Sequence, residues 1–276
     1  MEHYDILIIG GGAAGIAAAK AARGRKVLLA DRKDRLGGIL LQCAHPGFGK
    51  DKTGPEYVDQ LLEDFPEQTE VALRTTVTGL KEDRAMLWGP EGCREVSFSR
   101  AILATGCREV PLGALPIAGT RPEGVYTAGQ LQELVNVDGF VPEGPAVILG
   151  SGDIGLVMAW ELARRGLEVT LVEQKTALTG LTRNIRRLES YPIRYELGQT
   201  LSELRGFPRL EEVALSSGKC LPCATLLLAV GLRPERTLCR EAGDRLLLCG
   251  NCASIHPMVE GVTQEGREAG RTAAGL

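Results

Sequence analysis

The sequence is poor in aromatic residues, which make up 4% of its 276 positions. Few flat rings are therefore available to stack on bases, and a formal net charge of −3 gives no general attraction to nucleic acid. No apolar run approaches the roughly 20 residues that a membrane-spanning helix needs. The N-terminus also lacks a charged region followed by an apolar core, so we expect no signal peptide and a cytoplasmic protein.

Two glycine-rich segments of the same type are present, Gly10–Gly15 and Gly150–Gly155. Each follows a short apolar run, opens a helix-like stretch and precedes a second apolar run that ends in an acidic residue, Asp31 or Glu173. In such a segment the first glycine allows a tight turn, the middle one lets a pyrophosphate approach the backbone, and the third lets helix and strand pack closely. The pattern predicts an α/β fold with two Rossmann-like (doubly wound, three-layer) domains that hold two dinucleotides.

Three further apolar runs end in small or polar residues, as buried strands do: Ala101–Gly106, Leu226–Gly231 and Leu246–Asn251. Together with the two glycine-rich segments, they resemble the pyridine nucleotide-disulfide oxidoreductases, flavoproteins with two dinucleotide-binding domains that include the thioredoxin reductases. In that family the first glycine segment binds FAD, the second binds NADH or NADPH, and the last strand returns to the FAD domain. The resemblance implies an FAD domain of residues 1–112 and 242–276, with an NAD(P)H domain of residues 113–241 inserted into it.

The segment Leu36–Gly49 narrows the resemblance, because its Gly-Gly-Ile-Leu start and Gln-Cys-x-His-x-Gly-Phe-Gly end are similar to one subgroup. That subgroup comprises bacterial NAD(P)/FAD-dependent oxidoreductases associated with glycerol-3-phosphate dehydrogenase-like proteins. Opine oxidase and hydrogen cyanide synthase subunits are more distant relatives. For the electron-transfer partner, the resemblance favours a dehydrogenase subunit. The alternatives are an iron–sulfur electron-transfer subunit, a quinone or oxygen, and a homodimer is left open.

The residues that the resemblance assigns to FAD come from both ends of the chain. Asp31 would bond the ribose, and Asn251 would meet the ribityl chain, where the family usually has aspartate. A helix expected from about Gly261 to Ala274 would aim its N-terminus at the flavin and stabilise the anionic reduced form. The full set is Gly10, Gly12, Ala14, Gly15, Asp31, Arg32, Gly38, Val77, Ala104, Thr105, Gly106, Gly250, Asn251, Val262 and Thr263.

The second nucleotide is expected to be NADH, since Glu173 can accept bonds from both ribose hydroxyls and repels a 2′-phosphate. Dual use of NADH and NADPH is the alternative, because Lys175, Arg183, Arg186 and Arg187 follow in the sequence. Those arginines would otherwise form a solvated helix face. The full set is Gly150, Gly152, Asp153, Ile154, Gly155, Glu173 and Gly231.

Two cysteine arrangements of the family are absent from the sequence. Thioredoxin reductases have Cys-x-x-Cys just before the second glycine segment, and glutathione-reductase-like enzymes have Cys-x-x-x-x-Cys after the first; here only Cys43 stands in either place. Cys43 and His45 are the candidate catalytic pair, because a neighbouring histidine can lower the pKa of a thiol and favour the thiolate. A buried structural thiol beside a hydrogen-bonding histidine is the alternative. Cys252 is a secondary redox candidate.

Four of the eight cysteines form two Cys-x-x-Cys pairs, Cys220 with Cys223 and Cys249 with Cys252. This spacing is typical of zinc and iron–sulfur ligands. The strand pattern assigns the two pairs to different domains, so we predict no metal site.

The sequence thus predicts an FAD-dependent oxidoreductase that transfers hydride between NAD(P)H and flavin and exchanges electrons with a partner outside this chain. The alternatives are a disulfide reductase that uses Cys43 or Cys252, and a subunit that holds FAD without turnover. Elsewhere we expect a helix with Thr53 as its N-cap, and a small antiparallel sheet from residues 71–80 and 84–98.

Overall fold

The chain divides into two compact units. The outer unit comprises Met1–Arg108 and the chain from Arg233 onward, and the inserted unit comprises Glu109–Leu232. The computed structural model describes residues 1–241 and 243–275. Residues 242 and 276, which we expected in the FAD domain, lie outside the described residues.

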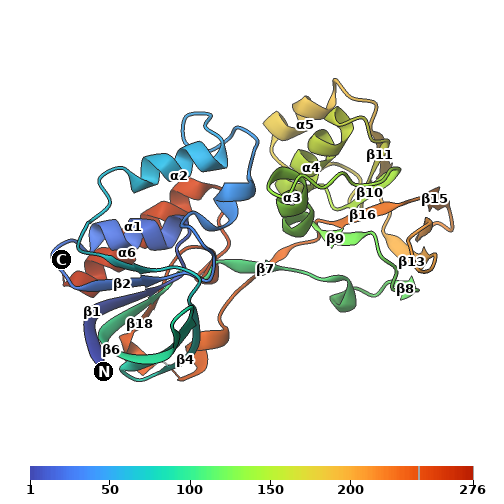
Figure 1. The fold of residues 1–276 in the computed structure, drawn as a ribbon. Coiled ribbons are helices and arrows are strands. Elements are labelled where there is room, and N and C mark those ends of the chain that lie inside the picture. The colour runs from blue at the N-terminus through green and yellow to red at the C-terminus, as the bar shows by residue number, and fades with distance from the viewer. Residues whose placement is uncertain (242, 276) are drawn as a thin grey trace. The chain divides into compact units, whose positions relative to one another are not determined.

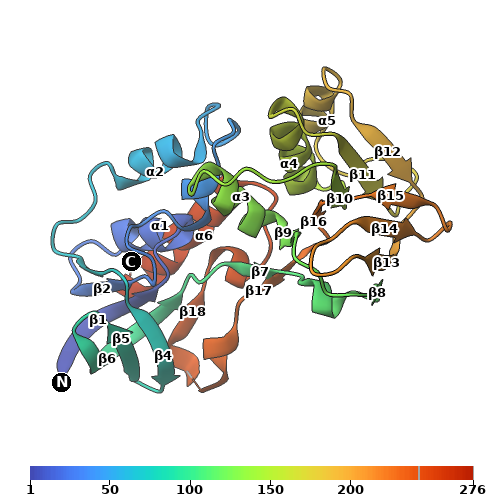
Figure 2. The same cartoon turned by 45° about the vertical axis from the view of Figure 1, so that its right-hand side comes forward.

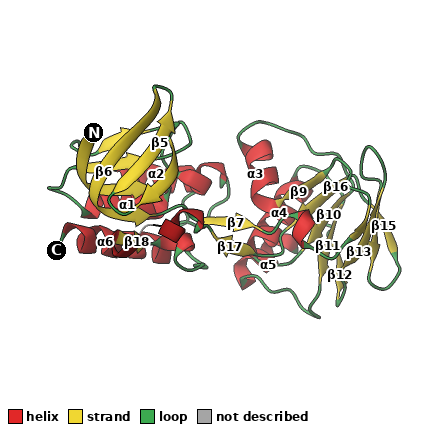
Figure 3. Ribbon diagram, turned by 90° about the horizontal axis from the view of Figure 1, so that it is seen from below, coloured by secondary structure: helices red, strands yellow, loops and turns green. Residues whose placement is uncertain are grey.

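The chain passes between the units in two short strands, β7 (Cys107–Glu109) and β17 (Leu232–Pro234), which form a two-stranded sheet (Figure 3). The division falls at 108/109 and 232/233, whereas we expected 112/113 and 241/242. Backbone hydrogen bonds flank the two crossings: Val110 N–H donates to the Gly231 carbonyl at 3.1 Å, and Glu235 N–H donates to the Gly106 carbonyl at 3.0 Å. These hydrogen bonds join backbone groups that are distant in sequence. The side-chain pattern therefore does not predict where the boundary between the units falls.

The outer unit is built on a seven-stranded sheet of order β3-β2-β1-β6-β5-β4, in which β18 also pairs with β6 (Figure 1). Strands β1, β2, β3, β6 and β18 pair in parallel, whereas β4 and β5 join in antiparallel fashion. Of the segments expected to be antiparallel, residues 71–72 belong instead to the parallel edge strand β3. The bounds are β1 (Glu2–Ile9), β2 (Val27–Ala30), β3 (Glu70–Ala72), β4 (Thr76–Lys81), β5 (Arg84–Gly89), β6 (Gly92–Leu103) and β18 (Leu246–Leu248).

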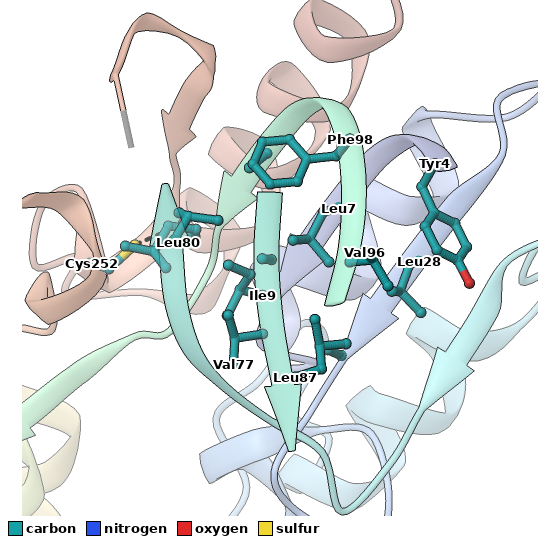
Figure 4. Close-up of a cluster of buried hydrophobic side chains, with 14 residues drawn as sticks. Tyr4, Leu7, Ile9, Leu28, Val77, Leu80, Leu87, Val96, Phe98 and Cys252 are labelled. Atoms are coloured by element: carbon teal, nitrogen blue, oxygen red, sulfur yellow. Dashed lines mark hydrogen bonds between the residues drawn. The ribbon is translucent and has the colours of Figure 1, made fainter. Parts of the chain in front are cut away.

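The two faces of this sheet are covered differently. Helices α1 (Ala13–Ala21) and α6 (Val259–Ala274) pack on one face, and α2 (Gly54–Leu62) packs against α1. Strands β4 and β5 fold over the opposite face, where their apolar side chains meet those of β1 and β2 (Figure 4). The outer unit therefore has three layers, and the layer opposite the helices is an antiparallel β-arm.

The inserted unit repeats this plan around a parallel sheet of order β12-β11-β10-β16-β9 (Figure 2). Three helices pack with one buried cluster, and a four-stranded sheet of order β15-β14-β13-β8 closes a second cluster. The strands are β8 (Ala118–Gly119), β9 (Val125–Thr127), β10 (Ala146–Leu149), β11 (Val169–Glu173), β12 (Arg194–Leu197), β13 (Leu201–Arg205), β14 (Glu212–Leu215), β15 (Cys220–Pro222) and β16 (Thr225–Leu228). The helices are α3 (Ala128–Asn136), α4 (Asp153–Arg164) and α5 (Thr182–Leu188).

Sequence explains the central strands and the start of α2. Strands β2 and β10 are buried along their whole length, which is why they are continuously apolar rather than alternating. At α2, Thr53 and Glu56 form a capping box: Thr53 N–H donates to the Glu56 carboxylate at 2.7 Å, and Glu56 N–H donates to Thr53 Oγ1 at 3.5 Å. The expected N-cap is confirmed.

Helices α1 and α6 approach each other closely because their contact is made by small residues. A Cβ atom on Gly266 would lie 2.3 Å from the Ala14 carbonyl oxygen, and one on Gly270 would lie 2.3 Å from that of Ala18. The C-terminal helix is thus packed directly on the helix that follows the first glycine segment.

Candidate functional site

In the first glycine segment, packing within the protein explains Gly10 and Gly15 but not Gly12. Gly10 has a φ of +107°, and a Cβ atom there would lie 2.5 Å from the Ala104 carbonyl oxygen. On Gly15 a Cβ atom would lie 1.8 Å from the Gly10 carbonyl oxygen. On Gly12, by contrast, it would meet nothing within 4 Å. The open space in front of Gly12 fits a pyrophosphate held at the N-terminus of α1.

The second glycine segment repeats this geometry. Gly150 has a φ of +104°, and a Cβ atom there would lie 2.4 Å from the Ala229 carbonyl oxygen. On Gly155 it would lie 2.2 Å from the Gly150 carbonyl oxygen, and on Gly152 it would again meet nothing within 4 Å. Each unit therefore presents one cradle of the shape that a dinucleotide pyrophosphate requires.

Both predicted acidic residues lie beside their glycine segments. In the outer unit, Asp31 accepts hydrogen bonds from Gly11 N–H at 2.5 Å and Lys33 N–H at 2.7 Å. In the inserted unit, Glu173 accepts from Ser151 N–H at 2.9 Å and from Ser151 Oγ at 2.6 Å. These bonds fix each carboxylate at the end of its strand, where it can accept further bonds from ribose hydroxyls.

The carboxyl of Glu173 is held in its charged form. Burial alone would raise the pKa of this group, but the hydrogen bonds from Ser151 and from Lys175 N–H outweigh burial, so that the pKa lies below its ordinary value. The Lys175 N–H donates to Glu173 Oε1 at 2.9 Å. A Glu173 that is charged at neutral pH favours hydroxyls and disfavours a phosphate as its neighbour.

Several other predicted FAD residues gather around the first cradle. A Cβ atom on Gly38 would lie 3.1 Å from Gly12 Cα. A Cβ atom on Gly250 would lie 2.9 Å from Ala14 Cβ and 3.1 Å from Val262 Cγ1. Segments far apart in sequence thus meet at the start of α1.

The ends of β6 and β18 supply the remaining residues near this cradle. Ala104 lies against Gly10, as described above, and Thr105 Oγ1 donates to the Glu235 carbonyl at 2.8 Å. Gly106 follows with a φ of +72°. Asn251 Oδ1 accepts from His256 N–H at 3.0 Å, and its Nδ2 donates to Cys107 Sγ at 3.8 Å. An amide nitrogen carries two hydrogens, so Nδ2 can make a second bond.

Two predicted site residues, Val262 and Thr263, are placed differently from expectation. Helix α6 begins at Val259 rather than near Gly261, so Val262 and Thr263 do not form its N-terminus. The Thr263 hydroxyl is buried and donates back to the Val259 and Glu260 carbonyls at 3.2 and 2.9 Å.

Burial differs among the remaining predicted site residues. Val77 is buried in the cluster beneath the β-arm, and Arg32 is exposed. Ile154 packs partly buried against the core of the inserted unit. Gly231 has a φ of +128° just beyond β16, the same place in its unit that Gly106 has after β6.

The environment of Cys43 is that of a structural thiol. Cys43 is 6% exposed and its Sγ donates to the Ile39 carbonyl at 3.3 Å. Burial raises the pKa of this thiol to about 12, opposite in direction to the lowering expected from His45. The His45 ring lies 5.2 Å from that of Phe48. The geometry favours the alternative in which both residues support the fold beside the first cradle.

Cys249 and Cys252 lie on opposite faces of the outer sheet. Cys252 is fully buried under the β-arm and its Sγ donates to the Leu103 carbonyl at 2.9 Å. Cys249 belongs to the helix-side cluster, where burial raises the pKa of its thiol to about 12. The other Cys-x-x-Cys pair, Cys220 and Cys223, belongs to the inserted unit. Within the described residues no three His, Cys, Asp or Glu side chains are grouped to hold a metal ion.

Sequence reasoning missed several residues that build the sites. Thr179 N–H donates to Ser151 Oγ at 3.0 Å, and Asn184 Nδ2 donates to Asp153 Oδ1 at 2.8 Å. In the outer unit, Glu265 accepts from Gly250 N–H at 2.8 Å and lies 3.0 Å from His256 Nε2. Of the residues that complete the second site, only Ser151 could have been recognised in the sequence, because it is a polar residue at the position where the first segment has glycine.

Comparison with known proteins gives a family and several relatives. The family described as pyridine nucleotide-disulphide oxidoreductase matches residues 4–247. Hydrogen cyanide synthase subunit HcnB of Pseudomonas protegens is 32% identical over 183 residues, which cover 62% of this chain and 38% of that protein. An opine oxidase subunit of Rhizobium meliloti is 27% identical over 305 residues, covering 97% of this chain and 57% of that protein.

An NADH oxidase of Thermoanaerobacter brockii is 32% identical over 274 residues, covering 94% of this chain and 39% of that protein. The chain thus spans between 38% and 57% of the length of these curated relatives. Among solved structures, thioredoxin reductase of T. acidophilum matches with a TM-score of 0.80 at 17% identity, over 100% of this chain and 99% of that one. This likeness concerns the fold alone, and it confirms the expected α/β architecture with Rossmann-like domains. None of the helices in the described part of the chain combines the length and apolar character needed to cross a membrane.

Proposed function

Because the chain belongs to the pyridine nucleotide-disulphide oxidoreductase family, we propose that it holds FAD in the outer unit and exchanges hydride with NADH held in the inserted unit. Family membership confirms the expected resemblance to this family, and it implies FAD and a nicotinamide nucleotide as cofactors. The observation that carries the proposal is the pair of open cradles at Gly12 and Gly152, one in each unit.

Assignment of FAD to the outer unit is supported by what surrounds Gly12. Gly38 and Gly250 bring two further segments of the outer unit to the same place. Asp31 would accept the ribose hydroxyls, and the amide of Asn251 would donate to the ribityl chain. The N-terminus of α6, at Val259, would place its positive dipole end toward the cofactor.

Assignment of NADH to the inserted unit is supported by Glu173. Its carboxylate is fixed by Ser151 and Lys175 N–H and stays charged, so it would bind ribose hydroxyls and repel a 2′-phosphate. The chemistry that the two bound cofactors supply is hydride transfer between nicotinamide and flavin. The chain's own part is to hold each cofactor and to orient its ribose and pyrophosphate.

We propose that the electrons pass to or from a second protein. Two of the relatives named above are called subunits, and the buried thiols of Cys43 and Cys252 disfavour an internal disulfide relay. The partner we favour is a dehydrogenase subunit rather than an iron–sulfur subunit. The reason is that the subgroup this chain resembles is associated with glycerol-3-phosphate dehydrogenase-like proteins. We assign this exchange to the cytoplasm, where the eight cysteines would remain reduced.

The central test is the absorbance of the purified full chain under anaerobic conditions. We expect a flavin spectrum that bleaches when NADH is added, and much less when NADPH is added. A chain that retains no flavin, even after reconstitution with FAD, would refute the proposal. Flavin that is retained but that neither nucleotide bleaches would favour the alternative of a subunit that holds FAD without turnover.

Two glycine variants test the two cradles separately. Gly12→Val should lose flavin, whereas Gly152→Val should keep flavin but lose bleaching by NADH, because each new side chain fills only its own cradle. Gly113→Val is the matched control, since a Cβ atom at this position also meets nothing within 4 Å but lies outside both cradles. If Gly152→Val bleaches like the wild-type protein, the inserted unit is not the NADH site.

A further inference from the structure

The two glycine segments differ in the charge of the residue that opens the helix. Helix α1 opens with Ala13 and has no acidic residue in its first turn, whereas α4 opens with Asp153. Both helices follow a middle glycine that leaves its cradle open. The second cradle therefore has a carboxylate at the helix end that would receive a pyrophosphate, and the first does not.

The Asp153 carboxylate is held in place by the segment that follows β11. Its Oδ1 accepts from Leu181 N–H at 2.7 Å and from Asn184 Nδ2 at 2.8 Å. A Cβ atom on Gly180 would lie 3.0 Å from the same oxygen and 3.1 Å from Asp153 N. The negative charge is thus tied to the first turn of α4 and cannot move away when another anion arrives.

A helix N-terminus carries only about half a positive charge. That charge stabilises one anion, and two anions that share it also repel each other across the few ångströms of the first turn. With Asp153 fixed there, a pyrophosphate at Gly152 has to share the helix end. At Gly12 the first turn of α1 contains no acidic residue, so a pyrophosphate there shares that turn with no carboxylate; Asp31 beside the first segment has its equivalent in Glu173 beside the second.

We propose that Asp153 weakens dinucleotide binding in the inserted unit, so that the second nucleotide exchanges as a substrate while the first stays bound as a cofactor. This inference rests on the proposed function and adds a reason for the different fates of the two nucleotides. Repulsion between two negative charges a few ångströms apart in a partly exposed site corresponds to an affinity for the nucleotide that is lower by about tenfold.

The test uses Asp153→Asn in the full chain loaded with FAD, so that added ADP-ribose addresses only the second cradle. Asparagine keeps an oxygen acceptor for Leu181 N–H and Asn184 Nδ2 but removes the charge. Titration calorimetry should show ADP-ribose bound about tenfold more tightly by the variant than by the wild-type chain. The gain should shrink at high salt, because screening weakens the repulsion.

Two controls separate charge from positioning. Asn184→Ala removes one of the bonds that hold Asp153 but keeps the carboxylate, so it should not tighten ADP-ribose binding. Adenosine, which has no phosphate, should bind alike to wild type and Asp153→Asn.

The outcomes distinguish this inference from the proposed function. If the wild type binds ADP-ribose and Asp153→Asn binds it equally well or more weakly, the role of Asp153 is overturned and the proposed function stays intact. Failure of the FAD-loaded wild type to bind ADP-ribose would overturn both. A gain of equal size for adenosine would also overturn the inference, because it would not depend on the phosphates.

Discussion

Replacing Gly266 by alanine should destabilise the outer unit, because this glycine lies where α6 crosses α1. A Cβ atom here would lie 2.3 Å from the carbonyl oxygen of Ala14 and 2.9 Å from Ala14 Cα. The crowded atoms belong to the backbone of a helix and cannot rotate away as the end of a side chain can. The two helices would have to separate by roughly 1 Å to reach ordinary contact distance.

The expected loss follows from two opposing terms. Alanine favours a helix over glycine by about 1 kcal/mol, whereas overpacking a tight contact costs about 1–3 kcal/mol. Since the clash is with backbone, the upper part of that range applies and the net loss is about 1–2 kcal/mol. For a unit of this size the midpoint of thermal unfolding should fall by roughly 2–8 °C.

The assay combines thermal unfolding, followed by circular dichroism, with the flavin content of the purified chain. Flavin content should fall as well, because Gly250 passes over Ala14 at the same crossing. Gly79→Ala is the matched control, since its Cβ atom would lie an ordinary 3.7 Å from Met86 Cβ. A Gly266→Ala protein that melts at or above the wild-type midpoint with full flavin content would refute the argument.

Three further predictions follow from single side chains. Glu173→Gln should bind NADPH more tightly relative to NADH. The folded-state pKa of Glu173 lies below its ordinary value of 4.5. The charged carboxylate should therefore stabilise the folded chain above pH 4.5, and this contribution should be lost as pH falls through the folded-state pKa, which urea unfolding at several pH values can check. Cys43, whose pKa is raised to about 12, should resist alkylation in the native chain while the exposed Cys93 and Cys220 react, as mass spectrometry of labelled peptides would show. Thr53→Ala should destabilise α2 by about 1 kcal/mol through loss of the capping box, seen as faster amide exchange confined to that helix.

Each of these has a clear contrary result. If the Glu173→Gln protein prefers NADH over NADPH as strongly as the wild-type protein does, Glu173 has no role in nucleotide selection. Rapid alkylation of Cys43 at neutral pH would restore it as a reactive thiol. Unchanged exchange in α2 after Thr53→Ala would mean that packing against α1 alone sets the stability of this helix.

The sequence was informative where local residues decide the structure. The buried strands, the turns at Gly10 and Gly150, and the capping box at Thr53 each depend on a few neighbouring side chains, so their patterns could be interpreted directly. The start of α6 was misplaced because its N-cap is Met258, whose side chain makes no capping bond. Without a capping residue, the sequence carries no mark of where the helix begins.

Contacts between distant segments could not be derived in this way. The burial of Cys43 depends on the close approach of the start of α2, since a Cβ atom on Gly54 would lie 2.8 Å from Cys43 Cβ. The bond from Thr179 to Ser151 likewise depends on how the chain returns after β11. Spacing in the sequence identifies which residues can bind a nucleotide, whereas their charge state and support come from the tertiary fold.

The split construction of the outer unit sets an order of assembly during synthesis. Helix α1 and the first cradle are made before the inserted unit, but the helix that packs on them, α6, is made after it. The inserted unit, by contrast, is continuous from Glu109 to Leu232 and can complete its core before α6 is translated. A growing chain would therefore complete the second cradle before the first, because α1 gains its packing partner α6 only after the inserted unit has been made.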